Sequence, residues 1–150
     1  MHLLRTLGFL TPAALAVTIA VGSGSAGAAA STHVQVRSGS LGHYLVDGRG
    51  RALYLFEKDR HGASTCFGGC AAIWPPLLAK GGVARGAGIS SAKLGTVARR
   101  GGGRQVTYAG HPLYYYAGDS RAGQIRGEGL NQFGAPWDVL STAGKGIDGD

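Results

Sequence analysis

The stretch Leu53-Tyr54-Leu55-Phe56-Glu57-Lys58-Asp59 recurs in outline sixty positions later as Leu113-Tyr114-Tyr115-Tyr116-Ala117-Gly118-Asp119. Both copies keep a leucine, a tyrosine, a second aromatic residue and an aspartate at the same spacing. Each copy closes a segment that has the pattern strand, tight turn, strand. Self-similarity at a fixed period indicates a repeated structural unit. We therefore predict two copies of one small unit packed into one fold.

Two hairpins surround these stretches. In the first, apolar runs at 44–46 and 52–56 flank Asp47-Gly48-Arg49-Gly50, and an Asp-Gly pair between apolar runs is a strong turn signal. In the second, residues 105–108 and 113–116 flank a turn at 109–112. A helical turn is expected at 70–73, where Pro75-Pro76 ends it. With 28 glycines and no long helical periodicity, the predicted class is mostly β. We expect a small single domain of antiparallel hairpins, duplicated about a pseudo-twofold axis, with one or two short helical turns.

The domain plan begins with a predicted secretory signal peptide at residues 1–30. Arg5 is followed by an apolar run from 7 to 21 and by small residues that offer cleavage after Ala28 or Ala30. A flexible N-terminal segment is predicted at 31–39, with a short strand at 34–36. The duplicated domain is predicted at 40–142, with repeat one at 40–79, a surface loop at 80–92 and repeat two at 96–142. Glycine-rich residues 117–136 precede a closing strand at 137–140, and residues 143–150 are predicted to be a disordered tail.

The charge balance limits the expected partners. The whole chain has a formal charge of +7, and removal of residues 1–30 takes away only Arg5. A basic exported protein is attracted to anionic polymers and lipid surfaces of the cell envelope, whereas nucleic acid is not expected outside the cytoplasm. We predict a secreted or extracytoplasmic monomer without a transmembrane segment or a lipid-anchor cysteine. Its expected partner is an anionic envelope polymer or an unknown envelope protein.

The repeated motif has two structural readings and one functional reading. Five extended residues span about 17 Å, so Asp59 cannot reach the Tyr54 hydroxyl within the same strand. Asp59 and Asp119 could each fold back to accept backbone N–H groups at the strand end. Alternatively, each aspartate could accept a hydrogen bond from a tyrosine of the other repeat. The third reading is a ligand site made from the tyrosine hydroxyls and the two carboxylates.

These motifs resemble a bacterial family of secreted and lipoprotein repeats that is described by its Y-x4-D motif and has no established activity. The resemblance rests on residues 41–59, on Cys66 and Cys70 with Trp74-Pro75-Pro76-Leu77, on 105–119, and on Trp137. It covers roughly residues 40–142 and implies an exported domain of a group sometimes associated with redox or envelope-stress roles. Many members are lipoproteins, and this chain departs from them because it lacks the lipid-accepting cysteine.

Cys66 and Cys70 are the only cysteines, and an even number in an exported protein predicts a disulfide. Gly68-Gly69 lets the intervening chain curl to the Cα separation that the bridge requires. The expected purpose of the bridge is to shape the turn that delivers Trp74 to the core. The alternative is a redox-active pair in which Cys66 precedes a short helix and has a lowered thiol pKa.

No catalytic constellation is recognisable, so we predict that the protein is not an enzyme. The histidines outside the signal peptide are His33, His43, His61 and His111, and none of them has a metal-ligand spacing. No cofactor is therefore expected, and a metal or haem carrier with Tyr, His and Cys ligands is the least favoured hypothesis.

Aromatic residues complete the candidate set. Trp74 and Trp137 each follow a motif and are predicted to be paired core anchors. Tyr54 and Phe56 should share one face of their strand, as should Tyr114 and Tyr116. Tyr115 then faces the other way, toward solvent or a partner, which makes it the candidate partner contact. The leading prediction is a non-catalytic envelope-associated binding or scaffolding domain, with the redox-active pair as the alternative.

Overall fold

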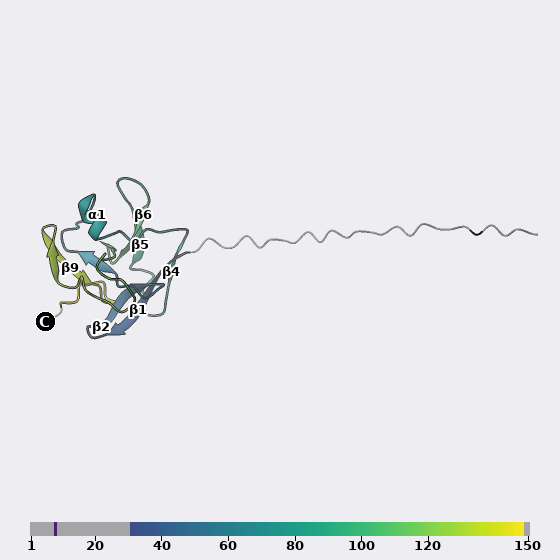
Figure 1. Ribbon diagram of the computed structural model, residues 1–150, viewed down its shortest axis with the longest axis horizontal. Coiled ribbons are helices and arrows are strands. Elements are labelled where there is room, and N and C mark those ends of the chain that lie inside the picture. The colour runs from purple at the N-terminus through teal and green to yellow at the C-terminus, as the bar shows by residue number, and fades with distance from the viewer. Residues whose placement is uncertain (1–7, 9–30, 149–150) are drawn as a thin grey trace, which may run out of the picture.

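The computed structural model describes Gly8 and residues 31–148 (Figure 1). The predicted signal peptide at 1–30 therefore lies, apart from Gly8, outside the described residues. In chain order the elements are β1 (Thr32–Gly39), β2 (Gly42–Asp47), β3 (Tyr54–Phe56), α1 (Gly69–Ile73), β4 (Val83–Arg85), β5 (Leu94–Ala98), β6 (Arg104–Tyr108), β7 (His111–Pro112), β8 (Leu130–Gln132) and β9 (Ala135–Val139). The mostly β class and the short helical turn are confirmed. No helix of the described residues is long and apolar enough to span a membrane.

The described strands form three small sheets with the orders β2-β1-β4, β3-β9-β8 and β5-β6-β7. All pairings are antiparallel except that between β1 and β4, which is parallel. Figure 1 shows the long β1–β2 hairpin on the side of the domain opposite α1 and the β5–β6 hairpin. The motif segments lie between these outer hairpins.

The two motif tyrosines meet at the centre of the fold. The Tyr54 N–H donates to the Tyr114 carbonyl at 2.8 Å, and the Tyr114 N–H donates to the Tyr54 carbonyl at 2.9 Å. Tyr54 also pairs with Val139, and Tyr114 with Pro76. Each motif therefore lies beside the segment that follows the tryptophan of the other repeat. The pseudo-twofold arrangement is confirmed, and its two halves are interleaved.

Both faces of the motif segments are buried, as the alternation of their side chains predicts. Tyr54 and Phe56 belong to a core that contains both tryptophans. Leu53 and Leu55 belong to a second core made mainly of aliphatic residues. The first core is referred to below as the aromatic core. It contains both central tyrosines and therefore brings residues of both repeats together.

Two predicted segment boundaries are wrong. Residues 31–39 were predicted to be flexible, but 32–39 form β1, which pairs with β2 from Val34–Asp47 to Gly39–Gly42. The buried Val34 anchors this strand in the aliphatic core. Residues 143–148 of the predicted tail are also ordered. Ile147 donates its N–H to the Val139 carbonyl at 2.9 Å and packs against the aromatic core, which fixes the tail to β9.

The predicted hairpins and loops are only partly correct. The first hairpin is reduced to a Val46–Ala52 bridge because β3 pairs with β9 instead. In the second hairpin, the strand predicted after the turn is reduced to the two residues of β7. The residues that follow β7 pair with Tyr54 and with the Pro75–Pro76 segment instead. The loop predicted at 80–92 contains β4, and the glycine-rich 117–136 region contains β8. Strand β5, with its Leu-Gly-Thr-Val pattern, was not predicted.

The β8–β9 turn contains a backbone conformation that disfavours its own residue. Gln132 pairs with Ala135, so Phe133 and Gly134 form a two-residue turn, with φ values of 58° and 95°. Two positive φ values are the requirement of a type I′ turn, which prefers Asn-Gly. Phe133 is also 46% exposed, so its ring gains little from burial. We expect Phe133→Asn to raise the free energy of unfolding by about 0.5–1 kcal/mol in urea denaturation. A loss of stability would contradict this account of the turn.

Candidate functional site

The spacing shared by the two motifs allows a reciprocal pair of hydrogen bonds between the repeats. The Tyr54 hydroxyl donates to Asp119 Oδ2 at 2.6 Å, and the Tyr114 hydroxyl donates to Asp59 Oδ2 at 2.6 Å. All four residues are buried. A hydroxyl that donates to a carboxylate forms a charge-assisted bond, which is among the stronger hydrogen bonds in proteins. The structure therefore has the cross-repeat pairing, one of the arrangements left open by the sequence.

The second oxygen of each carboxylate holds the loop that follows it. Asp59 Oδ1 accepts from the backbone N–H and the hydroxyl of Thr65, both at 2.7 Å. Asp119 Oδ1 accepts from the backbone N–H of Arg126 at 2.9 Å. The fold-back reading is therefore also correct, because each aspartate uses one oxygen for its own loop and the other for the opposite repeat. Such saturated carboxylates have little capacity left to bind a ligand.

Burial sets the protonation of the central tyrosines. Desolvation raises the pKa of Tyr54 far above its usual value, and the neighbouring Asp119 raises it further. Desolvation and the Asp59 hydrogen bond raise the pKa of Tyr114 in the same way. Both phenols therefore stay protonated at physiological pH and remain hydrogen-bond donors. Neither can act as a phenolate nucleophile or base in this setting.

Below the tyrosines, four aromatic rings form one continuous stack. Phe56 stacks on Trp137 with ring centroids 4.0 Å apart, Trp137 on Trp74 at 4.0 Å, and Trp74 on Tyr116 at 4.5 Å. Both tryptophans are fully buried, as expected for core anchors. Phe56 and Tyr116 hold the same position in their motifs, so the pseudo-twofold axis passes between the two indoles. The stack therefore joins the two repeats by apolar packing, and the tyrosine–aspartate hydrogen bonds join them by polar contacts.

Gln132 joins the two indoles and was missed by the sequence reasoning. The Trp74 indole N–H donates to Gln132 Oε1 at 2.9 Å, and the Trp137 indole N–H donates to the Gln132 carbonyl at 3.0 Å. One residue of β8 therefore supplies both acceptors that the buried indoles require. No spacing in the sequence links position 132 to position 74, because their contact depends on the fold.

The predicted disulfide between Cys66 and Cys70 is present, with a Cα separation of 5.2 Å. Cys70 lies in α1, and its carbonyl accepts the backbone N–H of Trp74 at 2.8 Å. The bridge therefore fixes the turn that leads into the aromatic stack. Cys66 is fully buried and Cys70 is 7% exposed. A redox-active pair requires an accessible sulfur, so burial favours a structural bridge.

Tyr115 does not project freely into solvent. Its hydroxyl donates to Asp47 Oδ2 at 2.8 Å, and its ring lies 5.4 Å from the Arg51 guanidinium carbon. Burial, followed by the Asp47 contact, raises the pKa of Tyr115 far above its usual value. The ring nevertheless lines an open surface pocket beside Asp47 and Lys80. Tyr115 therefore stays a candidate partner contact, with a hydroxyl that already donates to Asp47.

A family model described as a secreted repeat of unknown function matches residues 35–78 and 95–141. The chain belongs to this family. The resemblance inferred from the motifs is therefore confirmed, and the two matched regions correspond to the two interleaved repeats. No curated protein and no solved structure matches the chain.

Several carboxylates of this secreted-repeat protein lie close to one another around β9. Burial raises the pKa of Glu128 to about 7, and the neighbouring Asp138 and Asp148 also raise it. One Glu128 oxygen accepts the backbone N–H of Val139 at 2.6 Å, and the other is buried without a hydrogen-bond partner. Desolvation raises the pKa of Asp138, and Glu57 and Asp148 add to this effect. No group of three His, Cys, Asp or Glu residues within the described part of the chain could hold a metal ion.

The raised pKa of Glu128 predicts a loss of stability as the pH rises. The folded state favours the neutral acid, so this contribution is present below the ordinary pKa of about 4.5 and is lost as the pH rises through about 7. Because Glu128 is only partly buried, solvent screening limits the effect to ~1 kcal/mol. We expect Glu128→Gln to be more stable than the parent protein at pH 8 but not at pH 4. Urea denaturation across this range checks the difference, and a constant difference would contradict the prediction.

Proposed function

We propose that this protein is an exported, non-catalytic binding domain whose cationic surface attaches to an anionic polymer of the cell envelope. Its family is described as secreted, which is consistent with action outside the cytoplasm. The observation that carries the proposal is the segregation of charge between the interior and the surface. Most acidic side chains of the described residues are buried or partly buried, and three of the four buried aspartates accept hydrogen bonds, whereas most basic side chains are exposed.

The buried acids of the described chain are Asp47, Asp59, Asp119 and Asp138. The exposed acids are Glu57 and Asp148. The exposed basic residues of the described chain are Arg37, Arg49, Lys58, Arg60, Lys80, Arg85, Lys93, Arg100, Arg104, Arg121, Arg126 and Lys145. The surface that a partner meets is therefore more positive than the formal charge of the whole chain suggests. Such a surface attracts a polyanion over a distance set by the ionic strength.

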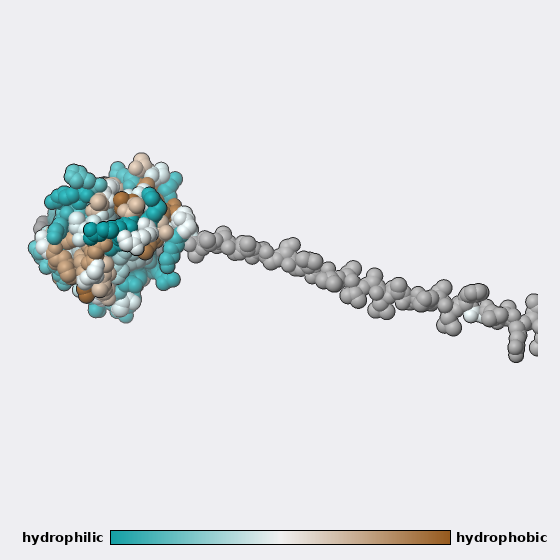
Figure 2. Space-filling view, turned by 90° about the horizontal axis from the view of Figure 1, so that it is seen from above, coloured by the Kyte–Doolittle hydropathy of each residue, from teal (hydrophilic) through white to brown (hydrophobic). Residues whose placement is uncertain are grey.

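The polar groups of the repeated motif support a non-catalytic role. The two motif aspartates and their partner tyrosines are buried and satisfy one another's hydrogen-bonding capacity. On the face shown in Figure 2, hydrophilic and hydrophobic residues are intermixed. The exposed large hydrophobic residues are Ile73 and Phe133. This surface suits a salt-sensitive polar contact better than a large apolar interface.

Retention on an immobilised polyanion tests the proposal. The protein recovered after export of the full chain is applied to polyphosphate and dextran sulfate columns at 50 mM NaCl and eluted with salt. We expect retention at low salt and elution well below 1 M NaCl, because salt screens exposed charges. Failure to bind either polymer at 50 mM NaCl would contradict the proposal. It would favour the other partner class considered above, an envelope protein.

Charge substitutions at the β5–β6 hairpin make the test specific. Arg100 and Arg104 are exposed there, whereas Arg99 is partly buried and donates to Ser64 and Gln105. We expect Arg100→Glu with Arg104→Glu to elute at clearly lower salt. The matched variant with lysine at both positions keeps the charge and should elute near the parent protein. Equal retention of the glutamate and lysine variants would exclude this hairpin from the contact.

A further inference from the structure

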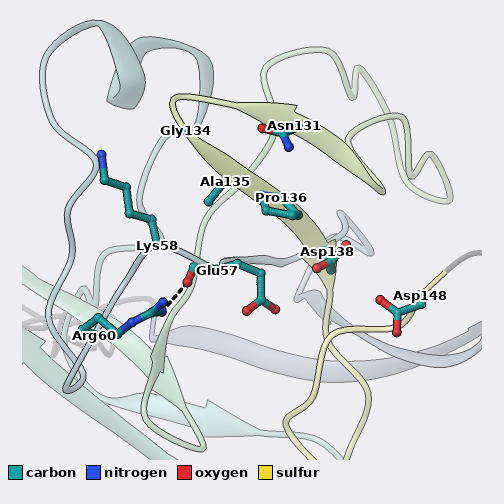
Figure 3. Close-up of a pocket in the computed structure, with 9 residues that line it drawn as sticks. All are labelled: Glu57, Lys58, Arg60, Asn131, Gly134, Ala135, Pro136, Asp138 and Asp148. Atoms are coloured by element: carbon teal, nitrogen blue, oxygen red, sulfur yellow. Dashed lines mark hydrogen bonds between the residues drawn. The ribbon is translucent and has the colours of Figure 1, made fainter.

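A pocket on this cationic domain collects the exposed negative charge. It has a volume of about 580 Å³ and lies between the segment after β3 and the β8–β9 hairpin (Figure 3). Three carboxylates line it, those of Glu57, Asp138 and Asp148. Glu57 and Asp148 are the exposed acids of the described chain. This acidic pocket is therefore an electrostatic exception on the protein surface.

Asp138 differs from the other buried aspartates in its hydrogen bonding among the described residues. Its side chain is 7% exposed, and no hydrogen bond to its carboxylate is formed by the described residues. The other three are saturated: Asp47 accepts from Arg49, Arg51 and Tyr115, and Asp59 and Asp119 are held as described above. The carboxylate oxygens of Asp138 are not themselves buried, so they face the solvent of the pocket. Asp138 lines the pocket, so an external cation can supply the missing partner.

The two basic residues at the pocket do not fill this role. The Arg60 guanidinium donates to the backbone carbonyls of Glu57 and Asp59. Lys58 extends away from Asp138 and Asp148 in Figure 3. Its Nζ lies toward the β8–β9 turn, 3.8 Å from where a Cβ on Gly134 would be. The carboxylates of the pocket therefore remain available to a ligand.

The adjoining turn indicates the chemical class of that ligand. Gly134 lines the pocket, and its neighbour Phe133 is exposed in a backbone conformation that a bulky side chain rarely adopts. Strained backbone conformations of this kind cluster at functional sites in proteins. Phe133 itself is not a lining residue, but an exposed ring next to a lining residue favours an organic cation that extends beyond the pocket, through cation–π attraction as well as charge. The carboxylates are also not grouped closely enough to hold a bare metal ion.

We propose that the acidic pocket binds an alkylammonium group, of the kind carried by a lysine side chain or a free polyamine. The ammonium group supplies the hydrogen-bond donors that Asp138 lacks and neutralises the repulsion among Asp138, Glu57 and Asp148. Burial, followed by repulsion from Glu57 and Asp148, raises the pKa of Asp138. The pocket borders two of the exposed cations, Lys58 and Arg60, but the β5–β6 hairpin used to test polyanion binding does not line it. Either proposal can therefore fail without the other.

Titration followed by amide NMR spectra tests the site in the exported protein. The probes are Nα-acetyl-lysine methylamide, its Nε-acetylated neutral analogue, spermidine and calcium chloride. We expect the lysine derivative and spermidine to shift the amide signals of Asn131, Gly134 and Asp138, and the neutral analogue to leave them unchanged. Tighter binding of spermidine indicates a free polyamine as the natural ligand, and tighter binding of the lysine derivative indicates a protein side chain. The proposal would be overturned if the neutral analogue shifted these signals as much as the lysine derivative does. It would also be overturned if calcium, added at the same concentration of positive charge, shifted them more strongly.

Three variants and one charge control locate the binding. Asp148→Asn and Asp138→Asn should each weaken binding of the lysine derivative at least fivefold. Ala92→Lys, at an exposed position before β5, changes the net charge equally and should leave binding within twofold of the parent protein. Phe133→Asn is expected to stabilise the fold, so a two- to threefold loss of binding in this variant cannot be ascribed to unfolding. Equal effects of Ala92→Lys and the two aspartate substitutions would reduce the effect to net charge and overturn the site.

Discussion

Trp137→Ala is expected to lower the free energy of unfolding by about 4 kcal/mol, the typical cost of truncating a buried tryptophan. Trp137 is fully buried and stacks on Phe56 on one side and on Trp74 on the other. Its removal opens a cavity at the pseudo-twofold axis, where both repeats contribute side chains. Because the stability of a domain this size is itself only 5–15 kcal/mol, a large part of it should be lost. Urea denaturation with tryptophan fluorescence and circular dichroism measures the effect.

Two further substitutions act as controls for Trp137→Ala. Trp74→Ala should have a similar cost, because Trp74 has the equivalent position in the other repeat and stacks on Tyr116. Phe67→Ala should cost far less, because Phe67 is only partly buried and its ring lies against the guanidinium groups of Arg99 and Arg100. A loss below about 1.5 kcal/mol for Trp137→Ala would show that the stack is not the centre of stability.

Asp59→Ala is expected to lower the free energy of unfolding by about 3 kcal/mol. The substitution removes the acceptor for the buried Tyr114 hydroxyl and for both donors of Thr65. Removal of one partner from a buried hydrogen bond costs about 1–3 kcal/mol, and more when the partner is charged. Ser64 still lies 2.7 Å from the Tyr114 hydroxyl and compensates in part. Thermal and urea denaturation both report the change.

A double-mutant cycle separates the cross-repeat bond from the loop contacts of Asp59. Tyr114→Phe removes only the hydroxyl and should cost about 1.5 kcal/mol. If the two residues interact as the structure shows, the double variant should be more stable than the sum of the two losses predicts, by about 1–2 kcal/mol. Asp119→Ala with Tyr54→Phe should behave in the same way because the repeats are related by pseudo-symmetry. If the losses of stability were strictly additive in both cycles, the structural role of the tyrosine–aspartate bonds would be contradicted. A ligand-binding role of the motif would then be favoured.

Interleaving of the repeats explains why both predicted effects are large. Tyr54 pairs with Tyr114 and with Val139, so a repeat cannot complete its central sheet without the other. The tyrosine–aspartate bonds and the ring stack also cross between the repeats. Damage at either position therefore weakens contacts that hold the halves together, and we expect unfolding to remain a single transition.

The elements that the sequence by itself determined are those set by local pattern. The alternation in the motif strands placed Tyr54 and Phe56 on one face and Leu53 and Leu55 on the other, because side chains of a strand alternate. The short spacing of Cys66 and Cys70, with two glycines between them, predicted the bridge. Pro75 and Pro76 correctly ended the helix that precedes them.

Only the tertiary structure decided which distant groups meet. It showed that each motif aspartate accepts hydrogen bonds both from its own loop and from the tyrosine of the other repeat. It also showed that Gln132 accepts hydrogen bonds from both indole N–H groups. It also ordered β1 and the segment up to residue 148, which local composition had marked as flexible. The acidic pocket joins Glu57 to Asp138 and Asp148 across some eighty or more positions of sequence. Such contacts depend on strand pairing across the pseudo-twofold axis, and pairing energy between remote strands leaves no local signal in the chain.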